Sequence, residues 1–207
     1  MTETREGDLA TRVAAIEARL DIGQLPMRYA LAVDGRDVDG WVRLFVPDVR
    51  VTRETSGRDA LREHISEQLS WFYRSVHQIC GHRIELDSPD SARGSVYCRA
   101  ELEVGDRWIV MAICYFDEYR RVEGEWLFQS RRERHWYAAD VVERPQEVAF
   151  DSWPVSGLRP GLPAAFPSWD QFWRGRESEI VTSAQVRTAG APLSSGAPAA
   201  PSVGELS

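Results

Sequence analysis

The chain has 207 residues, of which 43% are apolar and 28% are charged, and its formal net charge is −7. This length suits one ordinary globular domain with extensions better than two full domains. The sequence pI is near 5.2, and the densest basic run is the short stretch "RRER" at 131–134, so nucleic acids and anionic membrane surfaces are not expected partners.

Three cysteines, Cys80, Cys98 and Cys114, stand singly in apolar or alternating stretches, with no CxxC motif and no secretory signal ahead of them. We therefore expect reduced thiols in a cytoplasmic protein. The longest apolar run, 108–116, is far shorter than the roughly 20 residues of a membrane-spanning helix. Metal-binding histidine motifs, glycine-rich phosphate loops and the G-x-S-x-G motif do not occur in the sequence, so it predicts neither a metal nor a cofactor.

Helical spacing of apolar residues marks the N-terminal part of the chain, at Leu9, Val13, Ile16 and Leu20. A second apolar run begins at Pro26, a residue that suits the first turn of a helix, so the pattern predicts two helices or one kinked helix. A short helix ending at Phe45 should follow, with Asp37 or Asp39 as its N-cap.

The middle of the chain changes from a helical to an alternating period. A short strand is expected at 49–52 and a helix over 57–73, where four apolar residues share one face: Leu61, Ile65, Leu69 and Phe72. Alternation after Tyr73 predicts strands near 75–86, 95–104, 107–119 and 125–137. Helices followed by an antiparallel meander indicate an α+β fold, in which helices cover one face of a curved sheet and can enclose a pocket.

Composition divides the chain into three segments. Residues 1–145, with a core at about 8–140, carry the periodic patterns. In 146–183, Phe and Trp alternate irregularly with Pro and Gly, and we expect this extension to pack on the core or on a neighbouring subunit, as a lid or as an interface. Residues 184–207 are mostly Ala, Pro, Ser and Gly, a composition that predicts disorder.

Asp34 ends an apolar helical run and directly precedes Gly35. A carboxylate at this place is disfavoured, because the last carbonyls of a helix carry partial negative charge. One explanation is structural, since an aspartate can accept hydrogen bonds from the N–H groups of a turn. The other is that a cation or an imidazole shares the charge.

Three stretches of the chain resemble the SnoaL-like branch of the nuclear transport factor 2 superfamily: "RYALAVDGRDVDGWVRLFVPDV", "SVHQICGHRIEL" and "YFDEYRRVEGEWLFQSRRERHWY". The resemblance covers roughly 8–140 and implies a cone, in which a bent antiparallel sheet and helices surround a deep apolar pocket. The superfamily includes scytalone dehydratase, hexachlorocyclohexane dehydrochlorinase, bile acid 7α-dehydratase, ketosteroid isomerase, polyketide cyclases and non-catalytic members. The fold therefore implies no single reaction.

Asp34 and His77 match an aspartate and a histidine that act together in the dehydratase and dehydrochlorinase relatives. A histidine can take up a proton at neutral pH, while a carboxylate behind it fixes the tautomer and stabilises the imidazolium. The resemblance thus implies a cofactor-independent lyase or isomerase, with His77 as base and Asp34 orienting it. Its substrate would be a hydrophobic cyclic molecule, such as a steroid or a polyketide-like compound.

Tyr29 and Arg131 match further site positions of these relatives, a pocket tyrosine and an arginine that can stabilise a departing anion. Core packing is the alternative for Tyr29. For Arg131 we favour the alternative, an exposed strand edge. His64 and His82 have no matching partner and are weaker candidates.

Side chains alternate between the two faces of a strand, so the face on which His77 lies depends on where the regular strand begins. In a regular strand His77 would face the same way as Ile79 and opposite to Ile84. A bulge near Gly81 would place His77 and Ile84 on the same face, or His77 precedes the regular pairing. The face that lines the cavity stays open at this point.

A second class of function is a non-catalytic ligand-binding or scaffolding domain, including a role like that of the β subunit of ring-hydroxylating dioxygenases. Within the enzyme class, ketosteroid isomerisation and polyketide cyclisation also stay open. Relatives form dimers or trimers through the outer face of the sheet, so self-association is expected. The aromatic segment at 150–173 offers further surface for it.

Overall fold

The computed structural model of the chain describes residues 3–143 and 166–175. A first compact unit runs to Phe166 and a second begins at Pro167, and each is described separately. The second contributes the short helix α4 (Pro167–Trp173). Of the predicted extension at 146–183 only 166–175 are among the described residues, and the predicted tail at 184–207 lies outside them, so the division of the chain into three segments stays a prediction.

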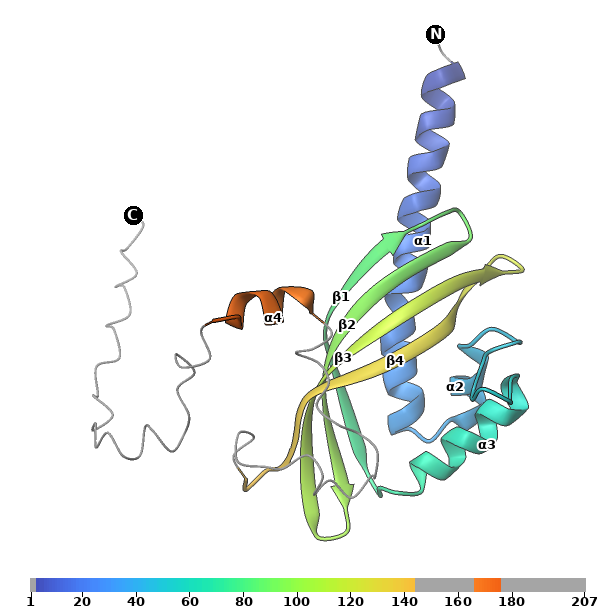
Figure 1. The fold of residues 1–207 in the computed structure, drawn as a ribbon. Helices are drawn as coiled ribbons and strands as arrows, with labels where there is room; N and C mark the ends of the chain where they lie inside the picture. Colours follow the sequence, from blue (N-terminus) through green and yellow to red (C-terminus); the bar gives the residue numbers. More distant parts are fainter. Residues whose placement is uncertain (1–2, 144–165, 176–207) are drawn as a thin grey trace, which may run out of the picture. The chain divides into compact units, whose positions relative to one another are not determined.

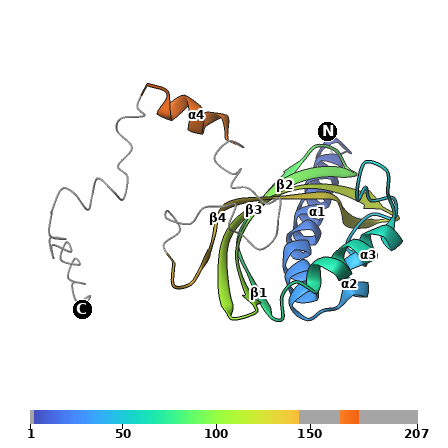
Figure 2. The same ribbon diagram turned by 60° about the horizontal axis from the view of Figure 1, so that its bottom comes forward.

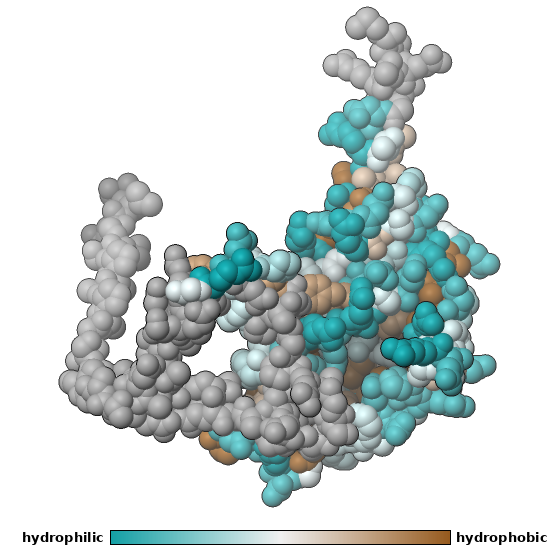
Figure 3. Space-filling model, in the orientation of Figure 1, coloured by the Kyte–Doolittle hydropathy of each residue, from teal (hydrophilic) through white to brown (hydrophobic). Residues whose placement is uncertain are grey.

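The N-terminal pattern forms one continuous helix, α1 (Glu3–Asp34), which contains Pro26. Its core face carries Ile22 and Leu25, both buried, whereas the predicted apolar stripe is exposed to solvent: Leu9, Val13, Ile16 and Leu20. Figures 1 and 3 show that this stretch of α1 extends past the strands, with apolar side chains among polar ones on its surface. The helix is therefore apolar on two sides, and the sheet covers one of them.

Two short helices follow α1. In α2 (Val38–Arg43) the N-cap is Asp37, whose carboxylate accepts the Gly40 N–H at 2.8 Å. Helix α3 (Arg58–Leu69) ends four residues earlier than the predicted end at 73. The strand expected at 49–52 is reduced to a single bridge between Arg50 and Ser56.

The second half of the unit is an antiparallel meander with the strand order β1-β2-β3-β4. Its strands, each close to or longer than predicted, are β1 (Ser75–Leu86), β2 (Ser91–Val104), β3 (Arg107–Val122) and β4 (Glu125–Asp140). Figures 1 and 2 show one strongly bent sheet with α1, α2 and α3 on its concave side. Apolar side chains from these helices and from the strands form the core between them.

A bulge in β1 determines which face of the sheet carries the side chain of His77. The pairing with β2 shifts register between Ile79 and Gly81, so Cys80 is the extra residue. His77 pairs with Ala100 and Ile84 pairs with Gly94, and these partners lie six residues apart, on one face of β2. The bulge alternative is confirmed, and both halves of β1 turn the same face toward the helices.

The three cysteines differ in their surroundings. Cys98 and Cys114 are buried free thiols, whereas Cys80 is exposed because it is the bulged residue. Burial raises the pKa of Cys98 to about 12, so its thiol stays protonated at neutral pH. None of the helices in the described ranges combines the length and the apolarity needed to cross a membrane.

Candidate functional site

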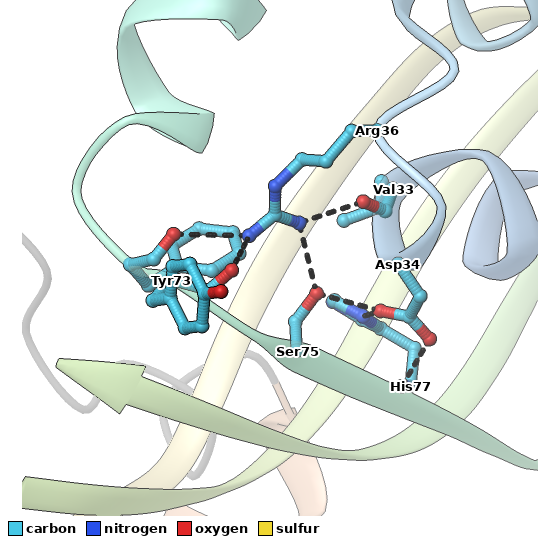
Figure 4. A network of polar contacts seen from close by, with 7 residues as sticks. Val33, Asp34, Arg36, Tyr73, Ser75 and His77 are labelled. Atoms are coloured by element: carbon cyan, nitrogen blue, oxygen red, sulfur yellow. Dashed lines mark hydrogen bonds and ion pairs between the residues drawn. The ribbon is translucent and has the colours of Figure 1, made fainter.

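Asp34 and His77 meet where the end of α1 lies beside the start of β1 (Figure 4). His77 Nδ1 lies 2.7 Å from Asp34 Oδ1, and the His77 backbone N–H donates to Asp34 Oδ2 at 2.8 Å. The side chain of His77 is 8% exposed and that of Asp34 is 25% exposed. Two hydrogen bonds to one carboxylate fix both the position of the strand and the orientation of the imidazole ring.

The hydrogen bonds assign the tautomer of His77. An ionised carboxylate only accepts hydrogen bonds, so Nδ1 carries the proton that bridges to Asp34. Nε2 is then the basic nitrogen of the neutral ring. It has no hydrogen-bond partner among residues 3–143 and 166–175.

Asp34 stays ionised although it is partly buried. Burial raises the pKa of its carboxyl, but hydrogen bonds from His77 and from the Ser75 hydroxyl outweigh this and hold the pKa below its ordinary value. The Ser75 hydroxyl donates to Asp34 Oδ1 at 2.7 Å. Three donors on one carboxylate therefore keep the charge that orients His77.

The C-terminus of α1 ends in a Schellman motif, which places Asp34 at the start of β1. The Asp37 N–H donates to the Ala32 carbonyl and the Arg36 N–H donates to the Val33 carbonyl. A Cβ on Gly35 would lie 2.9 Å from the Leu31 carbonyl oxygen, so the tight turn requires glycine there. The Asp-Gly pair of the sequence is thus a helix stop, and Asp34 is its last helical residue.

Two residues of this site, Ser75 and Arg36, were missed by the sequence analysis. Arg36 Nη1 donates to the Val33 carbonyl at 2.8 Å and to Ser75 Oγ at 3.3 Å, while Nη2 donates to the carbonyls of Phe72 and Tyr73. A basic residue directly after a helix-ending Asp-Gly pair was the available signal for Arg36. For Ser75 the signal was its position two residues before His77 on the same strand face.

Tyr29 is partly buried among aromatic rings, about one and a half turns before Asp34 on α1. Its ring centroid lies 6.5 Å from that of His77 in an edge arrangement and 5.6 Å from that of Trp41. Burial raises the pKa of Tyr29 to about 12, although the nearby Arg131 lowers it. The phenol is therefore a neutral donor at physiological pH, next to the imidazole.

Arg131 is buried, and the expectation of an exposed strand edge is wrong for this residue. Its Nε and Nη2 donate to the two oxygens of Asp117, at 2.9 and 2.7 Å, and the two side chains are 5% and 0% exposed. The register of β3 and β4 shifts after Glu118, which makes Gln129 an extra residue. This second bulge turns Arg131 inward, whereas Arg132 stays exposed as expected.

Aromatic rings surround the guanidinium of Arg131. Its Cζ lies 4.3 Å from the ring centroid of Tyr29, 4.2 Å from that of Tyr115 and 4.3 Å from that of Phe128. Burial by itself would lower the pKa of Arg131, but Asp117 raises it above its usual value. The cation is thus permanent and electrically balanced by one buried carboxylate.

His82 belongs to the same network, which the sequence pattern did not indicate. Tyr119 Oη donates to Asp117 Oδ2 at 2.8 Å and lies 2.9 Å from His82 Nε2. Since the single hydroxyl proton goes to Asp117, His82 Nε2 is the donor in the second bond. His64, on α3, is exposed and pairs with Gln68 at 3.1 Å, so neither histidine contacts Asp34.

A cavity of about 390 Å³ opens between α1, α2, α3 and the inner face of β3 and β4. Its apolar wall includes Tyr29, Trp41 and Tyr115, and its polar residues include Arg131 and Glu133. His77 is not among the lining residues, but Tyr29, whose ring centroid lies 6.5 Å from that of the imidazole, belongs to the wall. In the described ranges, no three His, Cys, Asp or Glu side chains gather as a metal site would require.

The bent antiparallel sheet with helices on its concave side is the α+β cone of the nuclear transport factor 2-like superfamily. The model of the family described as a SnoaL-like domain matches residues 14–132, and the chain belongs to this family. The resemblance noted in the sequence is thereby confirmed. The uncharacterized protein Rv2910c of Mycobacterium tuberculosis is 30% identical over 129 residues, which cover 58% of this chain and 87% of that protein.

Solved structures share the fold. A proposed scytalone dehydratase of Novosphingobium aromaticivorans DSM 12444 is 21% identical with a TM-score of 0.56, and the match covers 65% of this chain and 94% of that one. A hexachlorocyclohexane dehydrochlorinase of LinA type 3 from Novosphingobium barchaimii LL02 is 20% identical with a TM-score of 0.55, and the match covers 64% and 96% of the two chains. At these identities the similarity establishes a common fold.

Proposed function

We propose that this chain is a cofactor-independent lyase or isomerase that removes a proton from a hydrophobic, ring-containing small molecule. His77 acts as the base and Asp34 orients it. The observation that carries the proposal is the pair of hydrogen bonds between them, which directs His77 Nδ1–H to the carboxylate and leaves Nε2 without a hydrogen-bond partner among the described residues. The names of the structural neighbours, a dehydratase and a dehydrochlorinase, agree with an elimination.

In the proposed reaction, His77 Nε2 takes a proton from a carbon next to a leaving group or a carbonyl. The electrons of that C–H bond form a double bond as the leaving group departs, or move to the carbonyl oxygen in an isomerisation. The imidazolium that forms is stabilised by the charge of Asp34, which lies 2.7 Å from its other nitrogen. The imidazolium can then return its proton to the departing group or to another carbon.

Tyr29 and Arg131 have supporting roles in this proposal. Tyr29, neutral and close to His77, can donate a hydrogen bond to a departing or carbonyl oxygen. Arg131 uses its Nε and Nη2 on Asp117, so it acts through its positive charge on the cavity wall rather than through those donors. The aromatic wall suits a flat ring, such as that of a steroid or a polyketide-like compound.

A second candidate, ligand binding without turnover, has one observation in its favour. His77 lies outside the set of residues that line the cavity, so a molecule that fills only this space meets Tyr29 and Arg131 rather than the imidazole. A scaffolding role of the dioxygenase β-subunit type belongs to the same candidate. Self-association is proposed for either case, because Val76 and Tyr97 expose apolar surface on the outer side of the sheet.

The experiment that tests the proposal is a ligand-observed NMR screen of the wild type and of His77→Gln against steroids, bicyclic phenols and halogenated rings. Turnover of each hit is then assayed. We expect both proteins to bind the same ring compound and only the wild type to convert it. Gln78→Ala, on the exposed side of the same strand, is the matched control and should keep full activity.

The outcomes separate the two candidates. Equal turnover by His77→Gln and the wild type would remove His77 from the role of base. A ring compound that binds tightly and is converted by neither protein would favour ligand binding without turnover.

A further inference from the structure

Arg36 has a backbone conformation that side chains disfavour. Its φ is 59°, in the left-handed region, and it occupies the position of the Schellman motif that is usually glycine. Gly35 precedes it, where a Cβ would collide with the Leu31 carbonyl oxygen. An arginine that is kept in this conformation, one residue after a glycine, indicates that its side chain does something that a glycine would lose.

The Arg36 side chain joins three parts of the fold (Figure 4). It donates to the Val33 carbonyl in the last turn of α1, to the Phe72 and Tyr73 carbonyls between α3 and β1, and to Ser75 Oγ at the start of β1. Its Cζ also lies 4.6 Å from the ring centroid of Phe72. These contacts fix the segment that leads into β1 against the end of α1.

The contact with Ser75 also sets the direction of a hydroxyl proton. A guanidinium has only donors, so Ser75 Oγ accepts from Arg36 Nη1 at 3.3 Å. The Ser75 hydroxyl is then oriented to donate its own proton to Asp34 Oδ1 at 2.7 Å. Asp34 Oδ1 is the same oxygen that holds His77 Nδ1, so a chain of directed hydrogen bonds runs from Arg36 to His77.

We propose that Arg36 is a positioning residue for the Asp34–His77 pair: it orients the Ser75 hydroxyl and holds the start of β1 against the end of α1. This role rests on the proposed function, because it matters for chemistry only if His77 is the base. Arg36 acts through Ser75 and Asp34. It is not one of the described residues that line the cavity.

The test uses Arg36→Gly, Arg36→Lys and Ser75→Ala in the full chain. Glycine suits the left-handed conformation, so Arg36→Gly removes the side chain without straining the backbone. The main readout is the ¹⁵N spectrum of the His77 imidazole, which distinguishes the tautomer protonated on Nδ1 from the one protonated on Nε2. Thermal unfolding reports whether each variant is folded. Arg28→Met, which changes an exposed arginine on α1, is the matched control.

We expect the wild type and Arg28→Met to show the Nδ1-protonated ring. In Arg36→Gly and Ser75→Ala the ratio of the two tautomers should shift toward Nε2 protonation by about two- to tenfold, the range that one hydrogen bond of ordinary net strength represents. Arg36→Lys, which keeps the charge but loses the planar fork, should give an intermediate ratio.

An Arg36→Gly protein that is folded and keeps the wild-type tautomer ratio would overturn the positioning role. The spectra need no substrate, so this result is distinct from a failure of the proposed function. A wild-type His77 protonated on Nε2 would instead contradict the Asp34–His77 pair itself, and with it the proposed base.

Discussion

The guanidinium of Arg131 lies against the carboxylate of Asp117, its cross-strand neighbour, and both side chains are almost completely removed from solvent. The charges balance each other through two parallel hydrogen bonds. Three aromatic rings cover the faces of the cation. Removal of one partner would therefore leave the other charged group buried and uncompensated.

Asp117→Ala should destabilise the protein by about 3–5 kcal/mol, the usual cost of breaking a buried ion pair from one side. The free energy of unfolding, measured by urea denaturation, checks this. Glu118→Ala is the control, because Glu118 is exposed and its ion pair with Arg132 lies on the surface; its effect should stay below about 1 kcal/mol. If Asp117→Ala also lowered the free energy of unfolding by less than about 1 kcal/mol, the tight pairing of Asp117 with Arg131 would be contradicted.

Gly94→Ala should be destabilising by about 1–3 kcal/mol. A Cβ at this position would lie 2.7 Å from the Arg83 carbonyl oxygen and 3.0 Å from His82 Nε2, and the backbone oxygen cannot move without disturbing the pairing of β1 and β2. Gly81→Ala is the matched control, since a Cβ on Gly81 meets nothing within 4 Å. Chemical denaturation of both variants is the measurement, and equal stabilities would argue against the close approach.

Acid should remove the stabilisation that Asp34 provides. Its pKa in the folded state lies below the ordinary value of 3.8, so the unfolded chain takes up the proton first. The contribution of Asp34 is complete above pH 3.8 and is lost as the pH falls through the lower folded pKa. Urea unfolding between neutral pH and about pH 3 should show a smaller acid loss in Asp34→Asn than in the wild type. Asp59→Asn, an exposed carboxylate in α3, should follow the wild type.

Alkali should remove the stabilisation that the neutral Tyr29 provides. Burial raises the pKa of Tyr29 from 10.0 to about 12, so the unfolded chain loses its proton first as the pH rises. The stabilisation is complete below pH 10.0 and is lost toward pH 12, with a difference of roughly 2–3 kcal/mol. Tyr29→Phe should lose correspondingly less stability over this interval, whereas Tyr97→Phe, at an exposed ring, should behave as the wild type does.

Much of this fold is readable from periodicity, because the residues that alternate in 75–137 are the ones that line the two faces of the sheet. Asp34 and His77 come together as the resemblance implied. The inward turn of Arg131 was not predictable in the same way, since a bulge at Gln129 leaves the composition of the strand unchanged. A single extra residue reversed the face that simple alternation assigns.

Arg36 and Ser75 were missed for another reason. Their contact spans 39 positions in the sequence, and it exists only after α1 and β1 have been placed side by side. Local patterns report helix ends and strand faces, and a hydrogen bond between the two is a property of the assembled fold. The helix-ending Asp-Gly pair was visible, but the partner of the following arginine was not.

The bulge in β1 provides a site for selective chemical labelling. Cys80, the extra residue, is the exposed thiol of the three cysteines, while the other two are buried. A maleimide-linked fluorophore or spin label would therefore attach selectively at Cys80. Such a label would be three residues from His77 along β1, at a solvent-exposed residue, so it could follow ligand-induced changes near the imidazole in the otherwise unmodified protein.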